Sequence, residues 1–304
     1  MRILVTDGMD TAALAQLREG GHEVVEQFYE PDKLGGALRD FDAVVVRSAT
    51  KIRKEQIDAA KGSKLRLIIR GGVGVDNIDV AYAEQCGLTV KNTPRASSNS
   101  VAELALAHMF SCARYISASG FTMREGKWEK KAYGKGTELG GKKLGVVGFG
   151  RIGQRVGALA RAIGMDVAAY DIFHIPGIED QLGIPYMELD DLLARSDVIS
   201  VHAPAVDGGA LINPDTIAKM KDGVIIINTS RGANVDEAAL LAGLASGKIR
   251  AAGLDVYAEE PPKNDALYTH PRVSCTPHIG AATVEAQQRI GQEIVEIIQQ
   301  FAAS

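Results

Sequence analysis

Side chains that could carry out chemistry follow three apolar runs in the last third of the chain. Arg231 follows "VIIINTS", the pair Glu259 and Glu260 follows "GLDVYA", and His278 lies within "CTPHIG". A cation, a carboxylate and an imidazole suit hydride transfer at a carbonyl: the cation polarises it, and the acid keeps the proton-exchanging histidine protonated. Each residue alone has a structural interpretation, as a capping arginine, a solvated turn or a turn histidine. Their combination at strand ends favours an active site.

The apolar runs before these residues predict buried parallel strands with helical crossovers. From residue 143 onward the runs read "KLGVVGFG", "DVAAYD", "DVISVHAP", "GVIIINTSRG", "IRAAGLDV" and "RVSCTPH", with helical patterns between most of them. Such alternation is typical of an α/β doubly wound domain. Ligands gather at the carboxyl ends of the strands in these sheets, so residues after consecutive strands are expected at one site.

A glycine motif at the first of these strands predicts dinucleotide binding. Gly148, Gly150 and Gly153 form G-x-G-x-x-G after an apolar strand and before a helical pattern. The first makes the tight turn, the second lets the backbone approach a pyrophosphate, and the third lets helix and strand lie close. Asp171 ends the next strand, where an acid binds ribose hydroxyls and repels a 2′-phosphate, which favours NAD over NADP. The alternative is a glycine-rich turn without a ligand.

The first ninety residues predict a second α/β block. Strands are expected at "RILVT", "HEVVEQF", "FDAVVVRS" and "KLRLIIRGG", and the block ends near "GLTVKNTP". A single long helix is then predicted over Ser98–Gly120, followed by the polar surface segment "MREGKWEKKAYGKGTELGG". A final amphipathic helix is predicted over Thr283–Ala302, and it has no strand after it. This helix can return to the first block, which would make that domain discontinuous.

Composition excludes several classes of protein. The net charge of −4 over 304 residues argues against a protein that binds nucleic acid through its phosphates. The three cysteines lack metal-ligand spacing and indicate reduced thiols, so we expect no metal site and a cytoplasmic location. The N-terminus has too short an apolar run for a signal peptide, and no run is long enough to span a bilayer.

At this point a family resemblance is visible. The segments "RSATKI", "RGGVGVDNID", "SVAELALA", "GKWEKK", "GFGRIGQ", "SRGANVDEAAL", "GLDVYAEEPP" and "TPHIGAAT" occur in the order typical of the D-2-hydroxyacid dehydrogenase family. The chain resembles this family over nearly its whole length, and most of all its phosphoglycerate-oxidising branch. The resemblance implies two Rossmann-like α/β domains with the active site in a cleft between them. Residues 1–94 and 284–304 would bind substrate, residues 95–283 would bind NAD, and the enzyme would be a homodimer.

The resemblance also assigns residues to roles. It implies that Arg231, Glu260 and His278 form the catalytic set. It selects Glu260 rather than Glu259, because the acid of the family directly precedes the proline pair. His278 would protonate the forming alkoxide in reduction and act as the base in oxidation, with its pKa raised by Glu260. The residues implied at the NAD site are Val73, Gly148, Gly150, Arg151, Ile152, Gly153, Asp171, Ala203, Pro204, Thr229, Asp255 and Gly280.

Substrate contacts are expected from both blocks. Arg231 can fork onto the substrate carboxylate and carbonyl oxygen, and the N–H groups of Val73 and Gly74 can reach that carboxylate. Residues resembling the phosphate-binding cations of the phosphoglycerate branch are Arg47, Arg70, Lys130 and Lys131, and in that branch the two lysine positions can reach a partner subunit's site. They favour D-3-phosphoglycerate, oxidised to 3-phosphohydroxypyruvate as the first step of serine biosynthesis. The alternatives are a glyoxylate or hydroxypyruvate reductase and, from a different class, an NAD(H)-sensing corepressor-like protein.

The sequence departs from the family pattern at two places, and these departures affect the expected regulation and the expected cofactor contacts. The chain stops after the returning helix, so we expect no amino-acid-binding regulatory domain and no feedback inhibition by serine through it. The loop after His202, "HAPAVDGGALI", lacks the usual leucine–threonine continuation and is a residue shorter, which affects the expected cofactor contacts there.

Overall fold

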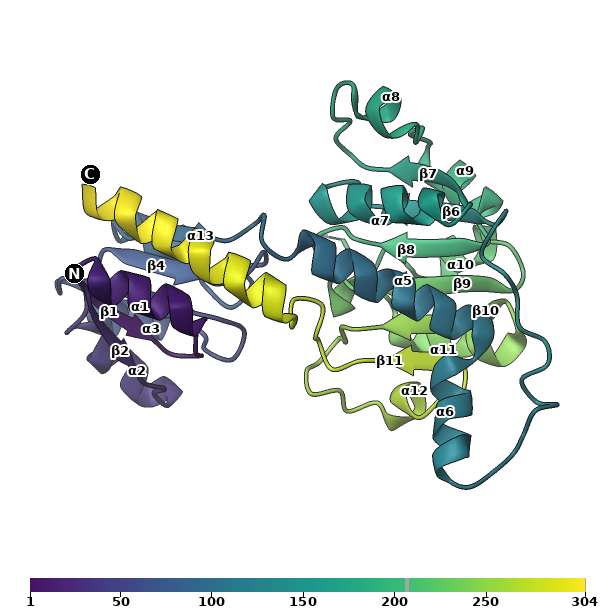
Figure 1. Cartoon of the computed structure of the whole chain (residues 1–304), viewed down its shortest axis with the longest axis horizontal. Helices are drawn as coiled ribbons and strands as arrows, with labels where there is room; N and C mark the ends of the chain where they lie inside the picture. The colour runs from purple at the N-terminus through teal and green to yellow at the C-terminus, as the bar shows by residue number, and fades with distance from the viewer. Residues whose placement is uncertain (206–207, 304) are drawn as a thin grey trace. The chain divides into compact units, whose positions relative to one another are not determined.

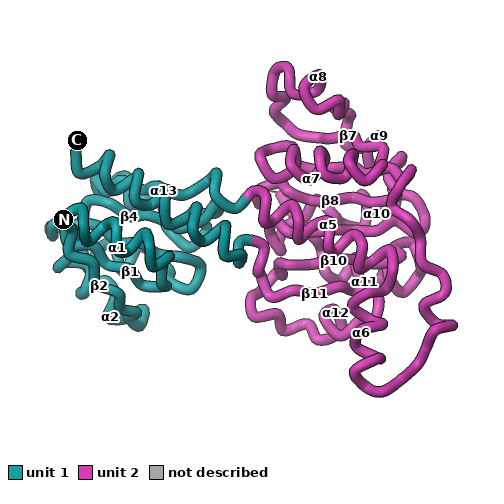
Figure 2. Tube along the Cα trace, in the orientation of Figure 1, with its two compact units in different colours: residues 1–97, 281–304 teal, residues 98–280 magenta. Residues whose placement is uncertain are grey.

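The chain forms two compact units. The computed structural model describes residues 1–205 and 208–303. Unit 1 comprises Met1–Ser97 and Ala281–Ser304, and unit 2 comprises Ser98–Gly280 (Figure 2). Each unit contains one parallel sheet with helices on its faces, which confirms the predicted α/β class with two Rossmann-like domains. The roles assigned to the two domains stay predictions.

Unit 1 is built on a five-stranded parallel sheet in the order β2-β1-β3-β4-β5. Its strands are β1 (Arg2–Val5), β2 (Glu23–Glu26), β3 (Ala43–Val46), β4 (Leu67–Arg70) and β5 (Thr89–Asn92). The inner strands are apolar and buried, whereas β2 lies at an edge, with an exposed glutamate at each end and two half-buried valines between them. The helices are α1 (Thr11–Glu19), α2 (Pro31–Leu38), α3 (Lys54–Ala60), α4 (Val80–Gln85) and α13 (Val284–Ala303).

The C-terminal helix α13 completes the core of unit 1. It runs beside α1 over one face of the sheet, where it buries Ile290, Ile294 and Ile298 (Figure 1). The two helices approach closely at Gly291, where a Cβ atom would lie 2.7 Å from the Cβ of Ala13. Helices α2, α3 and α4 cover the opposite face with a second apolar cluster. The sheet is therefore buried on both sides, as parallel sheets require.

Unit 2 is built on a six-stranded parallel sheet in the order β11-β10-β9-β8-β6-β7. Its strands are β6 (Lys143–Val147), β7 (Asp166–Tyr170), β8 (Val198–Val201), β9 (Val224–Asn228), β10 (Ile249–Leu254) and β11 (Val273–Cys275). The helices are α5 (Ser98–Arg114), α6 (Ile116–Arg124), α7 (Arg151–Ala162), α8 (Ile178–Leu182), α9 (Leu189–Arg195), α10 (Pro214–Lys219), the 3₁₀ turn η1 (Gly232–Asn234), α11 (Glu237–Ser246) and α12 (Asp265–Tyr268).

The strand order of unit 2 defines where a ligand should bind. After β6 the chain turns to β7 on one side and then returns to β8 on the other side of β6. The order therefore reverses between β6 and β8, and the carboxyl ends of strands at such a reversal form the usual ligand crevice. The predicted glycine motif follows β6 directly.

The predicted helix over Ser98–Gly120 is wrong at its middle. Helix α5 ends at Arg114, Tyr115 adopts the left-handed conformation with φ 56°, and α6 begins at Ile116. Arg250 explains the break, because its guanidinium lies 5.7 Å from the Tyr115 ring centre and donates to the Tyr115 hydroxyl at 3.2 Å. This tertiary contact overrides a sequence pattern that favours a continuous helix. No helix in the described part of the chain is long and apolar enough to cross a bilayer.

Candidate active site

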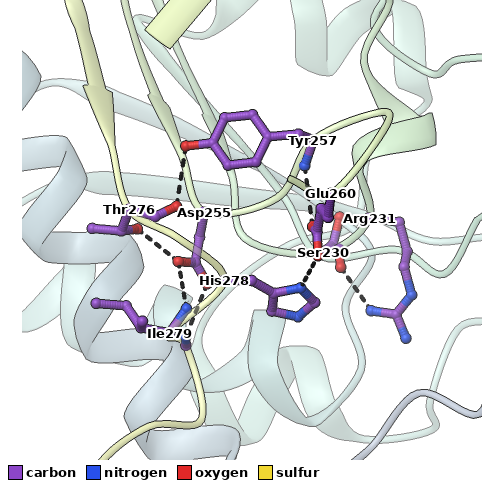
Figure 3. A network of polar contacts seen from close by, with 9 residues as sticks. Ser230, Arg231, Asp255, Tyr257, Glu260, Thr276, His278 and Ile279 are labelled. Atoms are coloured by element: carbon purple, nitrogen blue, oxygen red, sulfur yellow. Dashed lines mark hydrogen bonds and ion pairs between the residues drawn. The ribbon is translucent and has the colours of Figure 1, made fainter. Parts of the chain in front are cut away.

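Three adjacent strands of unit 2 bring the predicted catalytic residues together. Arg231 follows β9, Glu260 follows β10 and His278 follows β11, and these strands are neighbours in the sheet. Figure 3 shows the imidazole of His278 turned toward Glu260, with Arg231 on a neighbouring loop. The structure thus places these three side chains in one region, and their catalytic roles stay predictions.

Glu260 and His278 form the central contact of the site. The Nδ1 atom of His278 lies 2.7 Å from Oε2 of Glu260, and both side chains keep partial access to solvent, with exposures of 43% and 38%. The hydrogen bond to Glu260 and its negative charge raise the pKa of His278 although burial opposes this. Burial also disfavours ionised Glu260, but contacts with His278 and the backbone N–H of Tyr257 lower its pKa overall. The pair is therefore arranged to hold a proton on the imidazole.

The turn that carries Arg231 is held by side chains that donate to its backbone carbonyls. Asn228 donates through Nδ2 to the carbonyl of Arg231 at 2.8 Å, and Arg231 donates through Nη1 to the carbonyl of Ser230 at 2.7 Å. A Cβ atom on Gly232 would lie 1.8 Å from the carbonyl oxygen of Tyr257, so only glycine fits there. The positive charge of Arg231 helps to lower the pKa of Glu260.

The loop that carries His278 has an uncommon backbone conformation. His278 has φ 52°, in the left-handed region that few residues other than glycine adopt. Asp255, which is only 1% exposed, accepts the backbone N–H groups of Ile279 and Gly280, each at 2.8 Å. The side chain predicted to contact NAD thus also holds this loop (Figure 3). Asp255 remains a predicted cofactor contact.

The glycine motif has the geometry of a nucleotide-binding turn. A Cβ atom on Gly148 would lie 2.4 Å from the backbone nitrogen of Ala203, and one on Gly153 would lie 2.1 Å from the carbonyl of Gly148. A Cβ atom on Gly150 would meet open space, with no atom within 4 Å, and Gly150 caps α7 without a side-chain hydrogen bond. The N–H groups of the first turn, from Arg151 onward, therefore remain available to an anion. These residues fit a pyrophosphate.

Asp171 follows β7 with its carboxylate oriented by two backbone donors. Its Oδ2 accepts the N–H of Phe149 at 2.6 Å, and its Oδ1 accepts the N–H of Phe173 at 3.0 Å. A carboxylate has about four acceptor positions, so ribose hydroxyls can still bind. The location beside the glycine turn is the one predicted for an acid that selects NAD.

The other predicted contacts in unit 2 lie after β8 and β9. Ala203 and Pro204 follow β8, and Thr229 follows β9. The Thr229 hydroxyl is buried and has no hydrogen-bond partner within the described residues, so it can bind a ligand. Val206 and Asp207, which belong to the loop with the expected shortening, lie outside the described residues.

The predicted contacts in unit 1 form a group of their own. Arg47 follows β3 and Arg70 ends β4, and these strands pair directly, with Val46 opposite Arg70. Arg47 is positioned through its backbone N–H, which donates to Asp7 at 2.7 Å. Val73 and Gly74 lie in the loop after β4, where the Val73 carbonyl accepts Nδ2 of Asn92 at 2.6 Å. Two arginines thus end neighbouring strands.

The basic segment after α6 is exposed. Lys130 and Lys131 lie there as solvent-accessible side chains in unit 2. Their predicted contact with a substrate in a partner subunit stays a prediction.

Sequence reasoning missed the residues beneath the loops that carry the predicted catalytic side chains. His108 on α5 contacts the hydroxyls of Ser274 and Thr276, and Tyr257 donates to the carbonyl of Thr276 at 3.1 Å. The available signal in the sequence was a histidine within the mostly apolar helical run "VAELALAHMFSCA". Its partners lie more than 160 residues away along the chain, so the sequence could not name them.

Comparisons with known proteins agree with this geometry. Residues 106–280 match the model of the D-isomer specific 2-hydroxyacid dehydrogenase, NAD binding domain. The chain is 47% identical over 302 residues to a hydroxypyruvate reductase of Thermotoga maritima, covering 98% of this chain and 97% of that protein. It is 41% identical over 295 residues to a D-3-phosphoglycerate dehydrogenase of Rattus norvegicus, covering 96% of this chain but only 55% of that longer protein.

A solved structure is similar over almost the whole chain. A D-lactate dehydrogenase from Aquifex aeolicus, complexed with NAD and lactic acid, has a TM-score of 0.85 and 29% identity, covering 99% of this chain and 95% of that one. The family match includes the glycine turn, Asp171 and all three predicted catalytic residues. The chain therefore belongs to the D-isomer specific 2-hydroxyacid dehydrogenase family, whose NAD-binding domain it contains.

Proposed function

We propose that this chain interconverts a D-2-hydroxy acid and its 2-oxo acid with His278 as the acid–base group. The observation that carries the proposal is the 2.7 Å contact between His278 Nδ1 and Glu260, with Arg231 on the adjacent strand end. NAD, when bound, accepts the hydride in oxidation and NADH supplies it in reduction. The protein residues orient the substrate and move the proton.

The proton step follows from the orientation of the imidazole. Because Nδ1 faces Glu260, Nε2 is the ring nitrogen that can meet the substrate oxygen. In reduction the carbonyl carbon gains the hydride while the carbonyl oxygen takes the proton from Nε2, which leaves a neutral imidazole. In oxidation Nε2 takes the hydroxyl proton back. Arg231 binds the substrate carboxylate in a forked contact and polarises the carbonyl.

For the substrate we favour D-3-phosphoglycerate and 3-phosphohydroxypyruvate. The support is the pair Arg47 and Arg70 at the ends of two paired strands, since a phosphate needs cations that a small 2-hydroxy acid does not. The similarity to a D-3-phosphoglycerate dehydrogenase over 96% of this chain agrees with it. We therefore expect Arg47 and Arg70 to supply the phosphate contacts.

Hydroxypyruvate reduction is the second candidate. It is favoured by the 47% identity to a hydroxypyruvate reductase whose length the chain matches almost completely. Glyoxylate reduction belongs to the same alternative, because it needs the same catalytic set.

A substrate panel separates the two candidates. The purified chain is assayed with NADH on 3-phosphohydroxypyruvate, hydroxypyruvate and glyoxylate, because reduction is the favourable direction. The phosphorylated acid is expected to give the highest kcat/KM, and the variants Arg47→Ala and Arg70→Ala are expected to raise its KM selectively. Arg39→Ala on unit 1, whose guanidinium donates to the carbonyl of Ala59, is the matched control. An unchanged KM in both variants would reject the phosphorylated substrate.

A homodimer is part of the proposal. Several large apolar side chains in and after α5 and α6 are exposed by 39% to 79%, and α6 buries none of its residues within the chain. These exposed residues are Phe110, Ile116, Phe121, Met123 and Trp128. Exposed apolar residues along a helical segment of this kind are typical of a surface that a second subunit covers. Light scattering of the wild type and of Phe121→Glu tests it: the wild type should be dimeric and the variant shifted toward monomer.

A further inference from the structure

The segment before His278 is held by an unusually complete set of hydrogen bonds centred on Thr276. Its backbone N–H donates to the carbonyl of Leu254 at 2.9 Å. Its carbonyl accepts the Tyr257 hydroxyl at 3.1 Å and the N–H of His278 at 3.1 Å. Its hydroxyl contacts Asp255 at 2.6 Å and His108 at 2.9 Å. Every polar atom of Thr276 is therefore used to fix the start of this loop, and Figure 3 shows the bonds to Tyr257 and Asp255.

The direction of the hydrogen bonds around Thr276 follows from its neighbours. Asp255 also accepts the N–H groups of Ile279 and Gly280, and an ionised carboxylate can only accept. The single hydroxyl proton of Thr276 must therefore point to Asp255. Its oxygen can then only accept from Nε2 of His108, so this nitrogen carries a proton and Nδ1 accepts from Ser274.

His108 is suited to this role by its environment. It is 2% exposed, and burial lowers its pKa, so the ring stays neutral with one donor and one acceptor nitrogen. Its position on α5 is fixed, because a Cβ atom on Gly253 would lie 2.5 Å from the Cβ of His108. Helix α5 thus contacts β10 directly at this residue.

We infer that Thr276 is a positioning residue for His278, and that His108 sets the direction of the Thr276 hydroxyl bond. The hydroxyl and Asp255 together hold the backbone on both sides of His278. They thereby keep His278, which has a left-handed backbone conformation, within hydrogen-bond distance of Glu260. Neither residue touches the reacting atoms. The inference deepens the proposed function and rests on it for its effect on turnover.

The variants form a graded series. Thr276→Val keeps the shape and removes the hydroxyl, whereas Thr276→Ser keeps the hydroxyl and should restore wild-type behaviour. His108→Leu removes the donor to Thr276, and His108→Gln keeps a donor near the position of Nε2. Thr216→Val is the matched control, because the Thr216 hydroxyl donates to the carbonyl of Leu211 at 2.9 Å and caps α10.

The first readout is the pKa of His278 in the intact chain, which is measured by an NMR titration of labelled histidine. His278 is assigned among the six histidines by its loss in His278→Gln. The groups that act on it are Glu260 and Asp255, which favour its protonated form, and Arg231, which opposes it, with the Glu260 hydrogen bond the largest effect. Loosening of the loop weakens that bond, so Thr276→Val should lower the pKa of His278 toward its ordinary value, and His108→Leu should do so to a smaller extent.

The second readout is turnover. A displacement of 1 Å can reduce rates about a hundred-fold, so Thr276→Val should reduce the reductive kcat by about ten-fold or more with little change in the KM for NADH. Thr276→Ser, His108→Gln and Thr216→Val should retain wild-type kcat. If Thr276→Val folds poorly, His108→Leu carries the same test.

The two proposals fail in different ways. An unchanged His278 pKa and kcat in both Thr276→Val and His108→Leu would overturn the positioning role. Equal losses in Thr216→Val would also overturn it, because they would trace to general destabilisation. A wild type inactive on every 2-oxo acid, or full activity in His278→Gln, would refute the proposed function, while the NMR titration would still decide the role of Thr276.

Discussion

The glycine turn after β6 and the loop after β11 are constructed in opposite ways. The turn depends on missing side chains: Cβ atoms on Gly148 and Gly153 would lie 2.4 Å and 2.1 Å from backbone atoms. The loop depends on present side chains, since Asp255 and Thr276 hold a left-handed His278 by hydrogen bonds. The turn presents backbone N–H groups to an anion, whereas the loop presents one ionisable ring. Substitutions should therefore affect binding at the first and turnover at the second.

The largest effect is expected for His278→Gln in the loop. Loss of a general acid–base group typically reduces rates by about 10²- to 10⁴-fold, so the reductive kcat should fall within this range. The KM for NADH should change little, because the glycine turn is untouched. Steady-state kinetics measure both constants. His22→Gln in unit 1 is the control, and a full-rate His278→Gln would contradict the proton-transfer role.

The next largest effect is expected for Gly153→Ala in the turn, and it should fall on cofactor binding rather than on turnover. The added Cβ would meet the Gly148 carbonyl at 2.1 Å, and overpacking of this kind costs about 1–3 kcal/mol of stability. The KM for NADH should rise together with a lower melting temperature. Gly36→Ala on α2 is the control, because no atom lies within 4 Å of its added Cβ. An unchanged NADH KM would show that the turn does not depend on this close approach.

A more moderate effect is expected for Glu260→Gln, which tests the loop by its pH dependence. Glu260 raises the pKa of His278, so removing its charge should lower that pKa toward the ordinary value. Reduction needs protonated His278 and is lost as pH rises through this pKa, so the falling limb should move to lower pH. Oxidation needs the neutral ring and should begin at lower pH. The pH profile of kcat/KM in both directions checks the sign, and Glu259→Gln should leave it unchanged.

The smallest effect is expected for Asp171→Ser, beside the glycine turn. Removing the carboxylate also removes its repulsion of a 2′-phosphate, so the preference for NADH over NADPH should narrow by about ten-fold, the equivalent of about 1.4 kcal/mol. The ratio of kcat/KM for the two cofactors measures it. Wild-type protein that uses NADPH as well as NADH would show that Asp171 does not select the cofactor.

The contrast between turn and loop also shows what a sequence can reveal. Gly148, Gly150 and Gly153 act through local spacing, so the motif predicted both their geometry and their place after β6. The order of strands likewise predicted that Arg231, Glu260 and His278 would end neighbouring strands. These features are local or follow from the regular connections of α/β sheets.

The rest depends on contacts between distant segments. His108 meets Thr276 across 168 residues, and Arg250 ends α5 at Tyr115 across 135 residues. In both cases the side chain that decides the local structure comes from another element of unit 2. Hydrophobic periodicity predicts which face of a helix is buried, but it does not predict which polar side chain of another element that face will contact.

The contact between Gly232 and Tyr257 has a consequence for changing this enzyme by directed evolution. Two loops that carry predicted catalytic residues meet there backbone to backbone, with space for no side chain at all. A library that substitutes Gly232 will mostly yield variants in which the two loops are forced apart. The two predicted phosphate contacts differ in this respect. Arg70 donates to the carbonyl of Gly71 at 3.2 Å and lies against Gly72, whereas Arg47 follows a regular strand. New substrate preferences should therefore be selected more easily at Arg47.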